Sequence, residues 1–225
     1  MIRFLIFILL SSSIILHADK VNINNINVNL PKVKGYYLFS ASNHPEIIEA
    51  FNMVYASFGQ FYGLYVKEES SWKLLSGNTP NHYVTVGIPN GFDEIIFSKE
   101  GTEVFFKDMK KRLSDTTNNQ LQQEINSQLK KEYPHKELGN YLSKKFKKIN
   151  TISLDPHHSD KYTLSNTIYQ NIEGDIHCRT QTMVNINRRM LYITAVTLND
   201  FDLEENRNTS KYFAEKYLKA NKKAF

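Results

Sequence analysis

The stretch IHCRTQTMVNINRRMLYITAVTL, residues Ile176–Leu198, contains two β-type runs and decides the fold class. The first run alternates apolar or small residues with polar ones, a period of two that is typical of a strand with one buried face. The residues on that face are Cys178, Thr180, Thr182, Val184 and Ile186. The second run, Met190–Leu198, is apolar on both faces and therefore predicts a central strand. The short NRR segment between the runs is typical of an antiparallel hairpin.

More β-type runs lie upstream and share turn-like boundaries. They are Val21–Leu30, Gly35–Phe39, Gly59–Lys67 with Trp72–Leu75 as a short continuation, His82–Pro89, Ile149–Leu154 and Tyr162–Ile172. In the first of them the alternation slips by one residue at Asn24-Asn25, which predicts a bulge or a break there. The last two are separated by DPHHSDK, and EGD joins Tyr162–Ile172 to Ile176; both segments are short enough for hairpins.

Helical patterns occupy three places in the chain. Pro45 stands at the favoured first position of a helix whose apolar face continues to Phe58. Residues 98–149 form a helical layer, interrupted at Pro134. Asp202 and Glu205 resemble a capping box at the start of a final helix. Runs of antiparallel strands with grouped helices predict an α+β fold, a mostly antiparallel sheet flanked by helices.

The first eighteen residues, MIRFLIFILLSSSIILHA, have the layout of a secretory signal peptide. Arg3 precedes the apolar run Phe4–Leu16, and the small Ala18 precedes the charged start of the next segment. An uncleaved membrane anchor is the alternative, but a run of about 13 residues is short for a helix that crosses a bilayer. We therefore expect residues 1–18 to be removed and residues 19–225 to form one exported domain, periplasmic or secreted, without a membrane span.

Two segments carry a resemblance to known proteins. The end of the chain, LYITAVTLNDFDLEENRNTSKYFAEKYLKAN (Leu191–Asn221), resembles the closing strand and helix of exported bacterial proteins of unknown function. The opening VNLPKVKGYYL (Val28–Leu38) is similar to their Leu-Pro…Gly-aromatic entry, and the order of elements resembles the PsbP-like α/β/α sandwich. The resemblance implies a fold and an exported location, and it supplies no active-site residues.

The segment DPHHSD, Asp155–Asp160, is the most suggestive candidate for a metal site. Zinc sites need three or four ligands around one point, so His157 and His158 would require a third group such as His177. Neighbouring side chains on a strand point to opposite faces, and Asp-Pro favours a turn. The sequence therefore favours a polar hairpin turn exposed to water, with a metal site or a pH-responsive role as the alternative.

The middle of the chain is basic. Residues 105–149 contain eleven Lys or Arg and five Asp or Glu, a net charge of +6. The dense points are Lys110, Lys111 and Arg112, and Lys144, Lys145, Lys147 and Lys148. Export and the scarcity of interleaved aromatic residues argue against nucleic acid as a partner. An anionic envelope polymer, a lipid surface or another protein is the expected partner, and a solvated helix face is the alternative.

Other features allow two interpretations each. Cys178, the only cysteine, could pair between chains or react, but its place on the apolar face of a strand favours a small buried side chain. An aromatic group could line a ligand pocket or belong to the core between sheet and helix. Its members are Tyr55, Phe58, Phe61, Tyr62, Tyr65 and Trp72.

No sequence motif indicates catalysis. The chain has no G-x-S-x-G nucleophile elbow and no phosphate-binding glycine loop, and we expect no cofactor. The sequence favours a non-catalytic binding or interaction protein. The alternative is a metal-assisted hydrolase that uses His157, His158 and His177.

Overall fold

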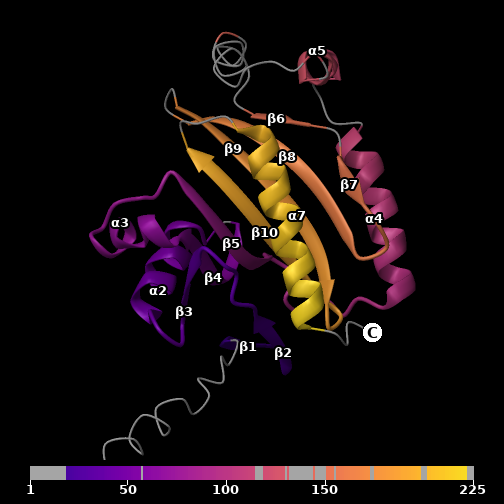
Figure 1. Ribbon diagram of the computed structural model, residues 1–225. Coiled ribbons are helices and arrows are strands. Elements are labelled where there is room, and N and C mark those ends of the chain that lie inside the picture. The colour runs from indigo at the N-terminus through magenta and orange to yellow at the C-terminus, as the bar shows by residue number, and fades with distance from the viewer. Residues whose placement is uncertain are drawn as a thin grey trace, which may run out of the picture.

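A computed structural model describes residues 19–56, 58–114, 119–129, 131, 144, 151–154, 156–172, 175–198 and 202–221. The described strands of the main sheet number eight, all antiparallel, in the order β3-β4-β5-β10-β9-β8-β6 with β7 also paired to β8 (Figure 1). They are β3 (Tyr36–Ser40), β4 (Gly59–Lys67), β5 (His82–Pro89), β6 (Thr151–Ser153), β7 (His158–Ser159), β8 (Thr163–Ile172), β9 (Asp175–Ile186) and β10 (Arg189–Leu198). The predicted α+β fold with a mostly antiparallel sheet is confirmed.

The β9–β10 hairpin forms the middle of this sheet. Its two-residue turn places Asn187 and Arg188 at φ 50° and 67°, the left-handed conformation of the hairpin turns that match strand twist. β10 lies between β9 and β5, so neighbouring strands cover both of its edges. Its residues are buried at Ile193, Ala195 and Val196, on both faces, which confirms the prediction of a central strand.

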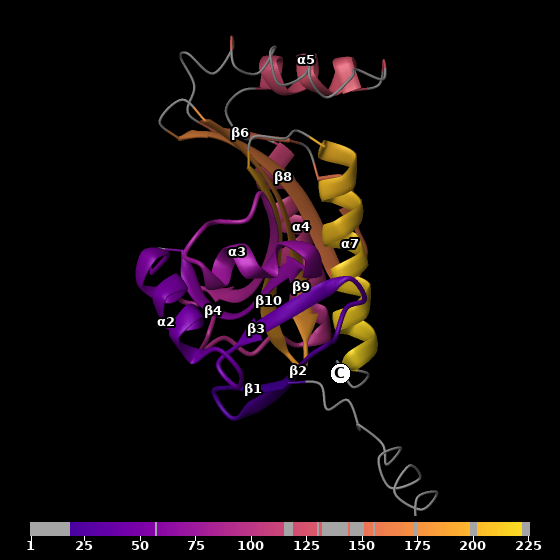
Figure 2. The same cartoon turned by 60° about the vertical axis from the view of Figure 1, so that its left-hand side comes forward.

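Helices cover both faces of the sheet, so the fold has three layers (Figures 1 and 2). The described helices are α2 (Pro45–Val54), α3 (Ser71–Leu75), α4 (Lys99–Ser114), α5 (Asn119–Leu129) and α7 (Leu203–Ala220), with a 3-10 turn at Glu68–Ser70. α7 lies along one face, and α2, α3 and α4 cover the other. The α/β/α order agrees with the sandwich expected from the sequence, while the specific PsbP-like likeness stays a prediction.

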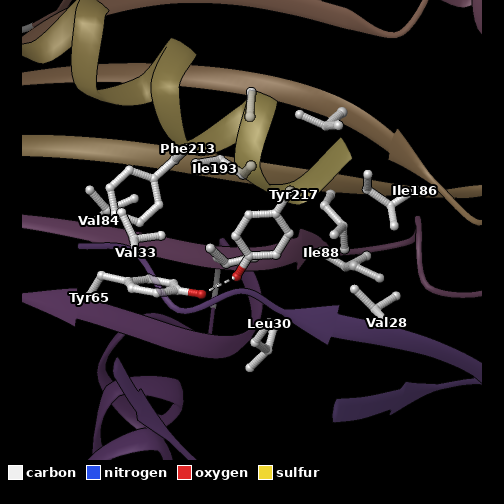
Figure 3. Packing of buried hydrophobic residues seen from close by; sticks show 14 of the residues in the cluster. Val28, Leu30, Val33, Tyr65, Val84, Ile88, Ile186, Ile193, Phe213 and Tyr217 are labelled. Atoms are coloured by element: carbon white, nitrogen blue, oxygen red, sulfur yellow. Dashed lines mark hydrogen bonds between the residues drawn. The ribbon is translucent and has the colours of Figure 1, made fainter. Parts of the chain in front are cut away.

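The core under α7 is aromatic at its centre (Figure 3). Phe213 and Tyr217 are fully buried and pack on Tyr65 of β4, with the Phe213 and Tyr65 ring centroids 4.9 Å apart. The hydroxyl groups of Tyr65 and Tyr217 lie 2.9 Å apart and hydrogen bond to each other. Both phenols therefore enter the core with a polar partner, as buried hydroxyl groups require.

Both ends of α7 are tied to strands, the first to β4 of the main sheet and the second to residue Asn29 near the N-terminus. The Asp202 carboxylate accepts a hydrogen bond from the Glu205 amide at 2.7 Å, which confirms the predicted N-terminal cap. The Glu205 carboxylate does not complete a capping box and instead accepts from Lys67 of β4 at 2.8 Å. At the other end, the Asn221 amide group bonds the backbone of Asn29 in both directions, at 2.8 and 3.0 Å.

The N-terminal segment differs from its prediction as one interrupted strand. It forms a separate hairpin of β1 (Asp19–Ile23) and β2 (Ile26–Leu30), beneath the end of α7 (Figure 2). Asn24 and Asn25 have φ 45° and 66°, so the slip in the alternation is a two-residue turn that reverses the chain. Asparagine tolerates this conformation better than most residues do, which explains the Asn pair.

One other local prediction is wrong. Trp72–Leu75, expected to continue a strand, belongs to the short helix α3, and Trp72 is exposed. The last predicted helix of the 98–149 layer lies outside the described residues, whereas α4 and α5 confirm the helical character of the part before it.

None of the described helices combines the length and the apolar character that a membrane crossing requires. The removal of residues 1–18 and the single-domain organisation stay predictions.

Candidate functional site

A cavity of about 190 Å³ lies on the sheet face opposite α7, beside α2. Its floor comes from β5, β10, β9 and β8, and its wall comes from α2, from the segment after it and from the first residues of β4. An engineered protein cavity of roughly 150 Å³ holds a benzene molecule, so this one has room for about one aromatic ring and a short arm. Its lining is mainly aromatic and aliphatic, with a few polar side chains.

Strand register arranges the floor in rows. One row runs from Tyr83 through Val196 and Arg179 to Ile168, across four strands. The adjacent row contains three polar residues on neighbouring strands, Thr85, Thr194 and Gln181. Directly opposed side chains of antiparallel strands have Cβ atoms about 4.5–5.5 Å apart, so each row is a nearly continuous strip. The cavity therefore has an apolar strip interrupted by Arg179 and, beside it, a polar strip.

Aromatic rings from α2 and β4 form the wall. Phe51 lies 4.5 Å from Tyr55 and 5.2 Å from Phe61, centroid to centroid, the latter pair edge to face. Phe51 also meets Tyr83 of the floor at 6.2 Å. These spacings are typical of favourable aromatic pairs. Phe58 stands at the mouth, where its side chain is exposed.

The six aromatic residues that the sequence suggested for either a pocket or the core are divided between the two locations. Tyr55, Phe58 and Phe61 line the cavity, as the pocket interpretation requires. Tyr65 lies in the core under α7, as the core interpretation requires. Tyr62 packs partly buried against that same core, and Trp72 is exposed in α3.

A β-bulge directs Phe61 into the cavity. The register of β4 against β5 shifts between Phe61 and Gly63, so Tyr62 is an extra residue. Uninterrupted alternation would put Phe61 on the same face as Tyr65, under α7. Opposite the bulge, a Cβ on Gly87 would lie 2.5 Å from the Gln60 carbonyl oxygen, so glycine is needed for the two strands to approach this closely.

Asn52 of α2 holds the bulge in place. Its carboxamide accepts from the Phe61 amide at 2.6 Å and donates to the Phe61 carbonyl at 3.0 Å. One side chain thus satisfies both backbone groups of a cavity-lining residue, and it fixes α2 relative to β4.

We expect Asn52→Ala to lower the free energy of unfolding by about 1 kcal/mol, because both bonds are lost and water reaches part of this site. Urea unfolding followed by circular dichroism measures the change. Asn78→Ala is the matched control, since Asn78 is exposed and its side chain donates only to the Ser76 hydroxyl. Equal losses in the two variants would contradict the role assigned to Asn52.

Arg179 is the one charged residue among the described residues that line the cavity. Its guanidinium carbon lies 5.9 Å from the centroid of the Phe58 ring. Its Nε atom is buried and has no hydrogen-bond partner among the described residues, and the same holds for Oε1 of Gln170 nearby. Both side chains therefore offer unused hydrogen-bonding capacity to whatever occupies the cavity.

Phenol groups complete the polar lining of the cavity. Burial raises the pKa of Tyr83, with a further increase from neighbouring Tyr55 and an opposing effect of the Arg179 charge. Burial also raises the pKa of Tyr192. Both phenols stay protonated at neutral pH. The described lining contains no carboxylate, histidine or cysteine, so its functional groups are hydrogen-bond donors, hydrogen-bond acceptors and one positive charge.

The three candidate metal-ligating histidines do not meet. His158 pairs with Ser165 and His177 pairs with Gln170, five positions apart along β8, or about 16 Å at the usual strand rise. β7 and β9 also flank β8 on opposite sides. Within the described ranges, no group of three His, Cys, Asp or Glu residues is placed to hold a metal ion.

The DPHHSD segment is less exposed than the sequence indicates. His158 belongs to the short strand β7, and its Nε2 lies 3.0 Å from the Thr163 hydroxyl. The His157 ring is partly buried, and its Nδ1 atom is buried without a hydrogen-bond partner in the described structure. Burial, with the positive charge of Arg207 on α7 and the nearby His158, lowers the His157 pKa to about 3. The predicted turn is exposed to water at Ser159 and Asp160, whereas His157 is partly buried.

The basic candidates are only partly described. Lys110, Lys111 and Arg112 lie exposed in the last turn of α4, where Arg112 donates to Asp108 at 2.8 Å. Lys144 is also exposed. Three further candidates, Lys145, Lys147 and Lys148, lie outside the described residues. Recognition of an anionic polymer, a lipid surface or another protein by these side chains stays a prediction.

Cys178 is fully buried on the α7 side of β9, which confirms its place on the apolar face. Burial raises the pKa of its thiol to about 11, partly opposed by the neighbouring polar side chains of Asn206 and Tyr169. A thiol in this state is mostly protonated at neutral pH and shielded from reagents. The structure therefore favours the structural interpretation of this cysteine.

Comparisons with known proteins yield two similar solved structures. They are a mutant of the protein Mog1 and the Ran-binding protein Mog1p of Saccharomyces cerevisiae, each 9% identical in sequence and aligned over 92% of both chains, with TM-scores of 0.30 and 0.29. No family model matches the sequence, and no curated protein matches it. The functional interpretation consequently rests on the residues of this chain.

Proposed function

We propose that this chain is a non-catalytic binding protein and that the cavity beside α2 is its ligand site. The supporting observation is a cavity of about 190 Å³ that combines an aromatic wall with a few convergent polar groups. That combination is typical of small-molecule sites, in which apolar surface provides affinity and a small number of polar groups set orientation.

The construction of the site supports a preformed pocket. The Asn52 bonds fix Phe61, and the ring contacts among Phe51, Tyr55 and Phe61 hold the wall together. A rigid site of this kind binds with a smaller loss of conformational entropy than a flexible one. The size of the cavity favours a ligand of about ten non-hydrogen atoms.

An exported location, periplasmic or secreted, is part of the proposal. Its support is the sequence of residues 1–18, with a charged start, an apolar run and a small residue at the end. A small-molecule binder outside the cytoplasm would act in capture or sensing. The alternative of a metal-assisted hydrolase has less support, since His158 and His177 lie far apart on the two sides of β8.

Binding of 3-phenylpropan-1-ol and 3-phenylpropionate tests the proposal. Both fit the volume of the cavity, and we expect dissociation constants of about 0.1–1 mM for at least one of them, as usual for ligands of this size. The binding is followed by NMR of the backbone amides. Addition of ligand should shift the signals of the floor residues in β5, β9 and β10.

A cavity-filling variant provides the control. Thr194→Phe places a ring into the floor and should abolish the shifts. Thr151→Phe makes the same change at an exposed position on β6 and should leave them intact. Circular dichroism and thermal unfolding establish that each variant is folded. Absence of binding of both compounds to the unmodified protein, or shifts that persist in folded Thr194→Phe, would refute the cavity as the ligand site.

A further inference from the structure

We propose that the natural ligand of the cavity is an organic monoanion, a carboxylate attached to an apolar body the size of one aromatic ring. This inference rests on the proposed function and names the chemical class of the ligand. It follows from the charge, the unused hydrogen-bonding groups and the division of the cavity into polar and apolar parts.

The charge of the cavity is positive and uncompensated. Arg179 contributes that charge, and the described lining residues include no carboxylate to neutralise it. No ion pair joins Arg179 to a described acidic residue. A partly buried guanidinium without a counterion is costly, so such groups are normally paired. A ligand carboxylate would provide the missing partner.

The hydrogen-bonding capacity around Arg179 matches a carboxylate head group. The buried Nε atom is a free donor, and charge-assisted bonds from arginine to a carboxylate are often bidentate and are stronger than neutral ones. Gln181 is two residues along on the same face of β9, and Thr194 lies opposite it on β10. An amide and a hydroxyl group can donate to the second carboxylate oxygen.

The opposite side of the cavity suits an apolar body. Phe51, Tyr55 and Phe61 form a wall of rings, and Val196 and Ile168 flank Arg179 on the floor. The volume leaves space for about one ring. One cation and no second positive side chain in the described lining favour a monoanion over a phosphate dianion, whose extra charge would be left unpaired.

Three compounds that share a phenyl ring on a short chain and differ in the head group test which head group the cavity prefers. We measure binding of 3-phenylpropionate, 3-phenylpropan-1-ol and 3-phenylpropylamine by isothermal titration calorimetry. The acid should bind about 10- to 100-fold more tightly than the alcohol, the range that a charge-assisted hydrogen bond supplies, and the amine should bind most weakly. Raising the salt concentration should weaken binding of the acid more than that of the alcohol.

The variant Arg179→Met removes the positive charge while it leaves the shape of the cavity nearly unchanged, so it tests the effect of the charge alone. It should reduce the preference for the acid over the alcohol to less than about threefold and leave affinity for the alcohol within about threefold of the original. Lys211→Met removes a positive charge from the exposed surface of α7 and should preserve the preference. Thermal unfolding establishes that both variants are folded.

The outcomes separate this inference from the proposed function. If acid and alcohol bind equally well, or the amine binds best, the anion inference is wrong and the cavity remains a ligand site. If none of the three compounds binds, both proposals fail. If a folded Arg179→Met protein keeps the full preference for the acid, Arg179 is not the anion-binding group and the inference is overturned.

Discussion

Phe213→Ala is expected to lower the free energy of unfolding by about 3–5 kcal/mol. Phe213 is fully buried between α7 and the sheet, and its ring centroid lies 5.0 Å from that of Tyr36 and 4.9 Å from that of Tyr65. Alanine would remove the apolar contacts of the ring and leave a cavity that the surrounding strands cannot fill. Urea unfolding followed by circular dichroism measures the loss.

Tyr212→Ala is the matched control on the same helix. Tyr212 is exposed at 38%, and it lies beside the Lys216 ammonium group, 4.8 Å from the ring centroid. Its removal should cost less than about 1 kcal/mol, as is usual for surface positions. Similar losses for the two substitutions would contradict the packing of α7 against the sheet.

Acidification should destabilise the protein through His157, by about 2 kcal/mol between pH 7 and pH 4.5. Burial lowers its pKa from 6.5 to about 3. Between these two values the unfolded chain binds a proton at His157 while the folded chain does not, so a falling pH favours unfolding. The stability contribution is therefore complete above pH 6.5 and decreases toward pH 3. The full shift would produce a larger effect, but water reaches part of the ring and reduces it.

The groups that face His157 define the experiment. Arg207 of α7 and neighbouring His158 are the charged or titratable groups that act on the His157 ring. His157→Gln and His157→Phe both remove its titration, one with a polar and one with an apolar replacement. Unfolding free energies of both variants should fall less steeply with acid than those of the original protein. Parallel pH profiles in all three proteins would show that His157 does not cause the effect.

Much of the fold is predictable because its signals are local. The alternation in β9, the apolar run of β10, Pro45 at the start of α2 and the Asp202 cap each act within a few residues. These patterns report which face of a strand or helix is buried, and burial of that face dominates local structure. They were therefore sufficient for the α+β class and for most element positions.

Local sequence patterns were misleading where the structure or exposure of a short segment depends on distant parts of the chain. The Asn24-Asn25 slip was predicted to be a bulge or a break in one strand, and the pairing of β1 with β2 shows that it is a turn. Trp72–Leu75 has a β-type composition but is too short for its pattern to distinguish a strand from a helical turn. His157 was expected in water because its neighbours are polar, but its ring is partly buried and lies within reach of the charge of Arg207, which comes from α7 at the far end of the chain.

The candidate site was only half visible in the sequence. The aromatic residues Tyr55, Phe58 and Phe61 were noted as a group that could line a pocket. Arg179 and Gln181 stand at the polar positions of the alternating run in β9, a pattern that normally indicates exposure to solvent. The available signal was the presence of helical patterns both before and after these strands, since helices on both sides of a sheet would also cover its polar face.

Local sequence patterns thus determine that this chain forms an antiparallel sheet with helices on its faces, since side-chain periodicity depends only on near neighbours. The cavity depends on contacts between segments far apart in sequence. β5 pairs with β10, which brings Thr85 beside Thr194, and the bulge at Tyr62 turns Phe61 toward Arg179's side of the sheet. Strand order and bulge position arise from the packing of the whole chain, so only the tertiary structure assembles the aromatic wall around an unpaired arginine.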